Sequence, residues 1–139
     1  MRTLTRILCG LPVVAAVTLA SAPASADVIL QQRYEEISID VNTCTGEDVL
    51  LTGTLFLLVR SVDGTGGIAV RYTYYLTGTG LTTGSRYVVN VQSAFTATST
   101  SFASTYRSTM VSTGPAPNQT VVARVSSDGS FTMETVCRG

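Results

Sequence analysis

Two long segments of mainly apolar residues, 49–59 and 68–76, form the centre of the hydrophobic pattern. Both are rich in Val, Leu, Tyr or Thr, and an Asp-Gly pair at 63–64 separates them. Asp and Gly tolerate the positive φ that a two-residue hairpin loop requires, so the pattern predicts a central β-hairpin. With that loop the alternating apolar side chains share one face, and Gly53 opposite Tyr74 leaves room for the tyrosine ring.

The opposite face of this hairpin is only partly polar. Threonines and arginines alternate there with Phe56, Leu58 and Tyr75. An antiparallel sheet that faces water normally carries polar residues on that side, so large apolar residues indicate contact with another surface. Phe56, Leu58 and Tyr75 are therefore a candidate partner surface.

Further strands are predicted before and after the central hairpin. The apolar positions of segment 28–41 change from even to odd numbers partway along, which predicts a β-bulge near Glu35 and Glu36. Segment 102–111 alternates more weakly, with serines among its apolar positions, and we predict that it is an edge strand.

A second Asp-Gly pair, at 128–129, indicates a hairpin at the end of the chain. A two-residue loop would leave Phe131 and Met133 on the face opposite to Val125, whereas a three-residue loop pairs Val125 with Phe131. The pattern therefore predicts a type I turn in which Gly129 has a positive φ. The two Asp-Gly turns are expected to differ in geometry.

These elements predict an all-β fold. No window of helical length in residues 27–139 has apolar residues at a 3.6-residue period. Seven to eight antiparallel strands with short turns fit an up-and-down β-barrel, with a Greek-key β-sandwich as the alternative. We favour the barrel because the predicted strands are longer than those of most sandwiches.

The first 26 residues have the pattern of a secretory signal peptide. Arg2 and Arg6 precede an apolar run at 7–19, and Ala24-Ser25-Ala26 follows as a cleavage site. The run is shorter than the roughly 20 residues of a membrane helix. We therefore expect a signal peptide at 1–26, a single secreted, extracellular domain at 27–139, and no transmembrane span in the mature chain.

Two cysteines, Cys44 and Cys137, remain in that domain. An even pair in an exported chain indicates a disulfide. Such a bridge would join the beginning of the domain to its last strand. In the chain-entropy model, closing a loop of this length contributes roughly 4 to 5 kcal/mol to stability.

Composition excludes much of the common active-site chemistry. The chain has no histidine and no lysine, which removes the Ser-His and Ser-Lys nucleophile pairs and the commonest zinc ligand. We assign no catalytic residue, metal or cofactor. The predicted mature domain has 7 basic and 9 acidic residues, a net charge of −2, and no basic run. Nucleic acid is therefore not an expected partner.

Carboxylates are the main remaining candidates for chemistry. Glu35, Glu47 and Asp48 could serve a hydrolase if two of them converged within about 10 Å. Asp40, Asn42, Glu47 and Asp48 could offer oxygen ligands to calcium, although their spacing lacks the regular pattern of a calcium loop. The same side chains could equally cap the loop through hydrogen bonds.

Tyrosines form a second candidate site. Tyr72, Tyr74, Tyr87 and Tyr106 all have the parity of core-facing residues. In a barrel they either fill the interior or line a pocket in which their hydroxyl groups orient a ligand.

The segment Asn42-Thr43-Cys44-Thr45-Gly46-Glu47 and the terminal Cys137-Arg138 resemble a group of small exported actinobacterial proteins without an assigned function. Members of that group usually carry proline at the position of Thr43 and often have histidines in their strands. This chain has neither, so no metal or catalytic role is transferred. The resemblance implies secretion, a cysteine bridge and an all-β domain.

The sequence leads to one principal functional hypothesis and two alternatives. The principal one is a non-enzymatic extracellular binding module for an unknown protein, a polymer or a small apolar ligand. The alternatives are a carboxylate-dependent hydrolase and an envelope-associated structural protein that packs through its edge strands.

Overall fold

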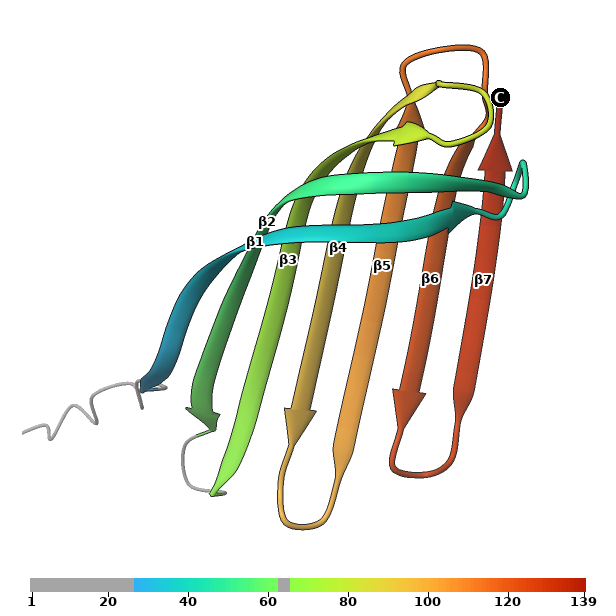
Figure 1. The fold of residues 1–139 in the computed structure, drawn as a ribbon. Helices are drawn as coiled ribbons and strands as arrows, with labels where there is room; N and C mark the ends of the chain where they lie inside the picture. The colour runs from blue at the N-terminus through green and yellow to red at the C-terminus, as the bar shows by residue number, and fades with distance from the viewer. Residues whose placement is uncertain (1–26, 63–65) are drawn as a thin grey trace, which may run out of the picture.

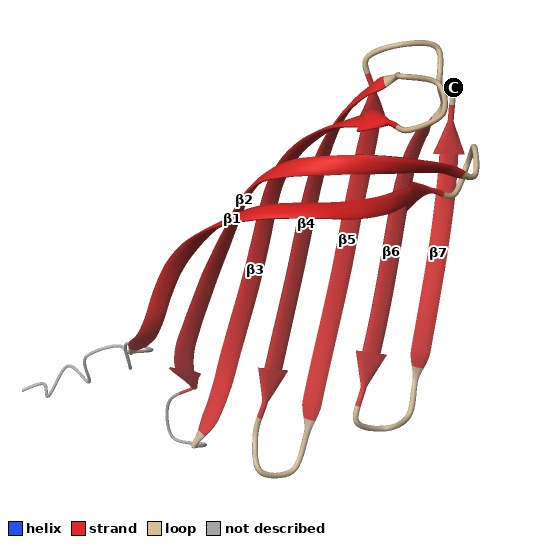
Figure 2. Cartoon of the chain, in the orientation of Figure 1, coloured by secondary structure: helices blue, strands red, loops and turns tan. Residues whose placement is uncertain are grey.

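The chain forms one curved antiparallel sheet (Figures 1 and 2). The computed structural model describes residues 27–62 and 66–139. In these residues it has seven strands and no helix. The strands are β1 (Val28–Asn42), β2 (Glu47–Val62), β3 (Gly67–Gly80), β4 (Arg86–Ala97), β5 (Phe102–Ser112), β6 (Asn118–Ser126) and β7 (Phe131–Arg138).

The predicted all-β class is confirmed, and each strand pairs with its neighbours in chain order. A Greek-key sandwich would need two sheets and a different strand order, so that alternative is wrong. The sheet is not closed into a barrel, because β1 and β7 are its two edges. The predicted signal peptide at 1–26 lies outside the described residues.

The sheet is covered at one end only. In Figure 1 the first part of β1 and the last part of β2 run beside β3, and the other parts of both strands cross in front of the later strands. There the turn after β1 reaches β7, and the predicted disulfide between Cys44 and Cys137 is present, with a Cα–Cα distance of 5.7 Å. We call this the disulfide end, the opposite end the open end, and the covered side of the sheet the inner face.

Core packing follows this division. The fully packed residues line the inner face at the disulfide end and are at most 7% exposed: Val49, Leu51, Leu76, Tyr87, Val89, Val91 and Met110. Farther along the same strands, Leu55, Leu57 and Phe95 are only half-buried. The crossing hairpin therefore completes the core at one end and leaves the inner face uncovered at the other.

The central hairpin forms with a register different from the predicted one. Val62 pairs with Gly67, so the connection is two residues longer than predicted, and its residues 63–65 lie outside the described residues. A shift of two positions preserves the face of every side chain, which is why the predicted faces are correct. Gly53 lies opposite Leu76 instead of Tyr74, and a Cβ there would overlap the backbone oxygen of Tyr75.

The last hairpin agrees with the prediction. Val125 pairs with Phe131, and Gly129 has φ of 84°. Asp128 Oδ1 accepts hydrogen bonds from the Ser130 amide and the Ser126 hydroxyl, each at 2.8 Å. These bonds stabilise the carboxylate and lower the pKa of Asp128 to about 2.

Two predictions about single strands are wrong. The β1–β2 ladder runs without interruption from Leu30 to Asn42, and its irregularity lies between Val28 and Leu30. Asn42 points inward, and its side-chain amide donates a hydrogen bond to the Pro117 carbonyl. Side chains alternate along the strand, so Ile37 points outward and is 76% exposed. The predicted edge strand β5 is internal, because it pairs with both β4 and β6.

Candidate functional site

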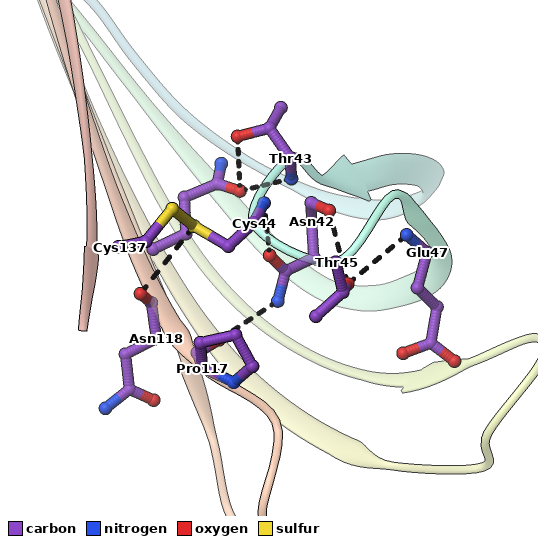
Figure 3. Close-up of a disulfide and its surroundings, with 9 residues drawn as sticks. Asn42, Thr43, Cys44, Thr45, Glu47, Pro117, Asn118 and Cys137 are labelled. Carbon is purple, nitrogen blue, oxygen red and sulfur yellow. Dashed lines mark hydrogen bonds between the residues drawn. A yellow bond between two sulfur atoms is a disulfide. The ribbon is translucent and has the colours of Figure 1, made fainter. Parts of the chain in front are cut away.

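Hydrogen bonds fasten the turn at the disulfide end to β6 (Figure 3). The Cys44 amide donates to Asn42 Oδ1 at 3.0 Å, and Asn42 Nδ2 donates to the Pro117 carbonyl at 3.2 Å. The Thr43 amide donates to Gln119 Oε1 at 2.6 Å. Asn42 and Gln119 are at most 4% exposed, so these bonds are protected from water and act together with the disulfide.

Glu47 is held in a cage of donors beside this turn. Its Oε1 accepts hydrogen bonds from the Thr83 amide at 2.7 Å and the Thr83 hydroxyl at 2.8 Å. Its Oε2 accepts from the Tyr87 hydroxyl at 2.9 Å. A Cβ on Gly80 would overlap the carboxylate, so a larger residue there would displace Glu47 from its donors. Hydrogen bonds from Thr83 lower the pKa of Glu47, and burial raises the pKa of Tyr87.

The cage predicts acid sensitivity. Because the pKa of Glu47 is lower in the folded than in the unfolded chain, its contribution to stability is complete above the unfolded pKa. It is lost as the pH falls below about 4.5 and through the folded pKa. We expect the unfolding free energy from urea titrations between about pH 7 and pH 3 to fall more steeply for the wild type than for Glu47→Gln. Asp128 titrates in both proteins, so its contribution cancels in the comparison. If the unfolding free energies of the two proteins fell in parallel with pH, the role given to Glu47 would be contradicted.

The structure does not bring the hydrolase candidates together. Glu47 is enclosed by its donors, whereas Asp48 faces the other side of the sheet. Glu35 is 79% exposed, pairs with Arg33 at 3.8 Å, and lies opposite Thr54. Thr54 and Asp48 are six positions apart along β2, a distance of about 20 Å. The convergence that the hydrolase alternative requires is therefore missing.

The oxygen ligands considered for calcium are also dispersed. Asn42 and Glu47 use their side-chain oxygens within the turn and the cage. Asp40 Oδ1 accepts a hydrogen bond from the Val41 amide at 2.8 Å. In the part of the chain that the structure describes, no group of three or more acidic or cysteine side chains gathers. The loop-capping interpretation accounts for these residues.

The four tyrosines of the predicted pocket all lie on the inner face, in three different rows across the sheet. Tyr87 is 1% exposed and belongs to the core at the disulfide end. Tyr72 and Tyr106 lie on either side of Ser93 in one row across the sheet, and Tyr74 lies one row nearer the disulfide end. The last three are half-buried and mark the boundary between the packed core and the open end.

The open end of the inner face is apolar and uncovered. Phe131 and Met133 on β7 are 65% and 62% exposed, and Tyr34, on the inner face of the other edge strand β1, is 44% exposed. Between these edges the Phe95 and Phe102 rings stack with centroids 6.5 Å apart. The predicted three-residue loop of the last hairpin already placed Phe131 on the same face as Val125. Its exposure follows only from the path of the β1–β2 hairpin.

The outer face holds the candidate partner surface. Phe56 and Tyr75 are 40% and 57% exposed and pack edge to face with centroids 5.9 Å apart. The Arg33 guanidinium lies 5.5 Å from the centroid of the Phe56 ring. Leu58 lies on the same face and is half-buried. The predicted placement of these residues on one outer face is therefore correct, while their role as a partner surface stays a prediction.

The sequence interpretation placed arginines on the outer face of the central hairpin but missed their gathering across the whole sheet. All seven arginines of the described residues have outer-face parity in the strand pairing. Four of them line two neighbouring surface hollows: Arg60, Arg71, Arg107 and Arg124. Their alternation with core-facing residues is visible in the sequence, but their proximity depends on pairings across five strands.

Comparisons of the chain with family models, with curated proteins and with solved structures give no match. Within the described ranges, no helix has the length and hydropathy needed to span a bilayer. Function is therefore inferred from the geometry of the two faces.

Proposed function

We propose that the protein is a secreted, non-enzymatic interaction module that pairs with a second copy of itself through the open end of its inner face. The signal-peptide pattern and the disulfide support secretion. The observation that carries the proposal is the difference in burial along one face. Leu51 and Val89 are 1% exposed, whereas Phe131 and Met133 are more than half exposed. Apolar surface left uncovered in this way marks an interaction site.

A second copy suits this face better than a small molecule. Ligand sites bury most of their ligand within a concave pocket, whereas the open end would leave a small molecule half exposed. Two sheets, in contrast, pack face to face about 10 Å apart and form the core of a sandwich. A two-fold axis perpendicular to the strands would bury the same patch twice and place the two disulfide ends at opposite ends of the pair.

Charge and area are consistent with this pairing. All arginines of the described residues lie on the outer face, so two inner faces meet without cationic repulsion. With strands about 4.8 Å apart and a rise of about 3.3 Å per residue, five residues on each strand give a flat patch of roughly 500 Å². This is near the lower limit for a specific interface, so we expect a reversible dimer with micromolar affinity.

Analytical ultracentrifugation of a Phe131→Ser/Met133→Ser variant tests the proposal. We expect the wild type to shift from monomer to dimer between about 1 µM and 1 mM. The variant, which loses two apolar anchors, should need at least about tenfold higher concentration. Ile37→Ser/Ile39→Ser removes two exposed apolar residues from the outer face and should dimerise as the wild type does.

Three results would contradict the proposal. A wild type that stays monomeric at about 1 mM would exclude the pair. An equal loss in the Ile37/Ile39 control would place the contact elsewhere. A monomer that binds the neutral dye Nile red stoichiometrically, with loss of binding in the Phe131/Met133 variant, would show that a small apolar molecule occupies the face instead.

A further inference from the structure

Two hollows on the outer face form one trough. They have volumes of about 540 and 340 Å³ and share Arg71 and Ala94 in their walls. We propose that this trough binds a linear polysaccharide that carries anionic groups. The site lies on the face opposite to the predicted dimer contact, so the proposal goes beyond the proposed function and does not depend on it.

The floor of the trough follows β4, where the outer-face residues are small or polar. Ala94 lies opposite Arg71 on β3 and opposite Thr105 on β5, and Thr105 lies opposite Arg124 on β6. Two short side chains therefore separate two arginines within one row. The two Cα atoms are three strand spacings apart, about 14 Å. Side chains of this length can approach one anionic group from both walls.

Arginines continue along both walls. Arg60 on β2 lies one row nearer the open end and lines the smaller hollow. Arg107 on β5 lies opposite Gln92, one row nearer the disulfide end, and lines the larger one. From the open end toward the disulfide end, the cations thus lie first on the β2–β3 side, then on both sides, and then on the β5 side, so an extended chain with repeated charges that crosses the floor obliquely can meet all of them.

These cations have no carboxylate partner in the described part of the chain. The ion pair there is Arg33–Glu35, outside the trough. Glu134 on neighbouring β7 lies opposite Val122 and forms no ion pair with either Arg107 or Arg124. An anionic ligand would therefore meet guanidinium groups that are free to form paired hydrogen bonds with its oxygens.

The other lining groups distinguish a polysaccharide from other anionic polymers. The hydroxyl groups of Thr73 and Thr105 and the amide of Gln92 match the hydroxyl groups of sugar rings. Single-stranded nucleic acid needs a series of aromatic platforms, and Tyr75 is the one outer-face aromatic residue in this lining. Extended peptides pair with the free edge of a sheet, whereas the trough lies on its face.

Isothermal titration of the purified mature chain with polygalacturonate, dextran sulfate, neutral dextran and oligothymidylate tests the proposal. We expect one or both anionic polysaccharides to bind, neutral dextran not to bind, and added salt to weaken the binding. Whichever of the two binds more tightly identifies carboxylate or sulfate as the preferred group.

Substitutions then locate the site. Arg71→Gln and Arg124→Gln should each weaken polysaccharide binding about tenfold, because each removes a charge-assisted pair of hydrogen bonds. Arg138→Gln removes the same charge outside the trough and should have little effect. Arg71→Lys keeps the charge but loses the planar fork, so most of the loss should persist. All three positions are exposed, and unchanged circular dichroism will establish that each of the four variants is folded.

Several outcomes would overturn the proposal. Failure of both anionic polysaccharides to bind would reject the ligand class. An equal loss of polysaccharide affinity in Arg138→Gln would show that the overall charge of the protein attracts the polysaccharide and that the trough is not a specific site. Tighter binding of oligothymidylate than of either polysaccharide would assign the trough to nucleic acid. None of these results depends on the dimer, because ultracentrifugation measures self-association without the polysaccharide.

Discussion

Replacing both cysteines of the disulfide, Cys44→Ser/Cys137→Ser, is expected to lower the free energy of unfolding by about 4.6 kcal/mol. The bridge spans 93 positions, and the chain-entropy model gives this value for a loop of that length at 25 °C. The bridge also holds the β1–β2 hairpin over the core. Urea titration monitored by circular dichroism measures the loss of unfolding free energy. In the extreme case the variant would already be unfolded at 37 °C without urea.

Reduced wild-type protein is the control for the serine substitutions. If the loss comes from the broken bridge, reduction and substitution should lower stability by similar amounts. A loss below about 1 kcal/mol in both would mean that the hydrogen bonds of Asn42, Thr43 and Gln119 hold the turn without covalent help. Such a small loss would also mean that the bridge is not what holds the β1–β2 hairpin over the packed end of the core.

The two hairpins show which parts of the fold can be predicted from the sequence. Alternation indicates the face of each side chain, and both predicted hairpins have the correct faces. The register depends on loop length. In the last hairpin, parity selects between loops of two and three residues, so the prediction is correct. In the central hairpin, a shift of two residues leaves every face unchanged, and parity cannot detect it.

Other features depend on contacts between distant strands. The inward side chain of Asn42 binds the Pro117 carbonyl 75 positions away, and this contact decides that Ile37 and Ile39 point outward. Apolar pattern alone favours the reverse orientation. We predicted that β5 is an edge strand because its apolar residues alternate weakly. Strand pairing uses backbone hydrogen bonds, so a strand that contains serines can still pair on both sides. Glu47 was a candidate for catalysis because the sequence does not reveal the donors of the 82–87 segment that enclose it.

The proposed sites have the same origin. Arg71 and Arg124 are 53 positions apart, and three strand pairings place them in one row. The sequence has no basic run, but a basic trough can form without one, because strand pairing brings distant arginines together. If the inner faces pair and the troughs bind as proposed, the dimer presents two polysaccharide sites on opposite sides. Such a dimer would crosslink acidic chains through its faces, whereas the envelope-associated alternative relies on packing through the edge strands.

A pair of leucines on β2 tests how far the core extends, and Leu51→Ala should have the larger effect. Leu51 is 1% exposed and contacts a fully packed region, so its truncation should lower the free energy of unfolding by about 3 kcal/mol. Leu57 lies on the same face six residues farther along and is half-buried. Leu57→Ala removes the same atoms and should lower it by only about 1 kcal/mol in dilute solution. Urea titrations at about 1 µM protein compare the two.

Repeating the titrations at higher protein concentration then tests whether a second copy covers the open end of the inner face. Dimer formation stabilises the folded chain by mass action, so the effect of Leu57→Ala should grow as the concentration rises toward the millimolar range. The effect of Leu51→Ala should stay constant, because its surroundings are complete within one chain. Equal losses at about 1 µM would show that the open end is already covered within the monomer. In that case the exposed apolar residues Phe131 and Met133 of β7 would not be an interaction surface, and the proposed pairing would lose its physical basis.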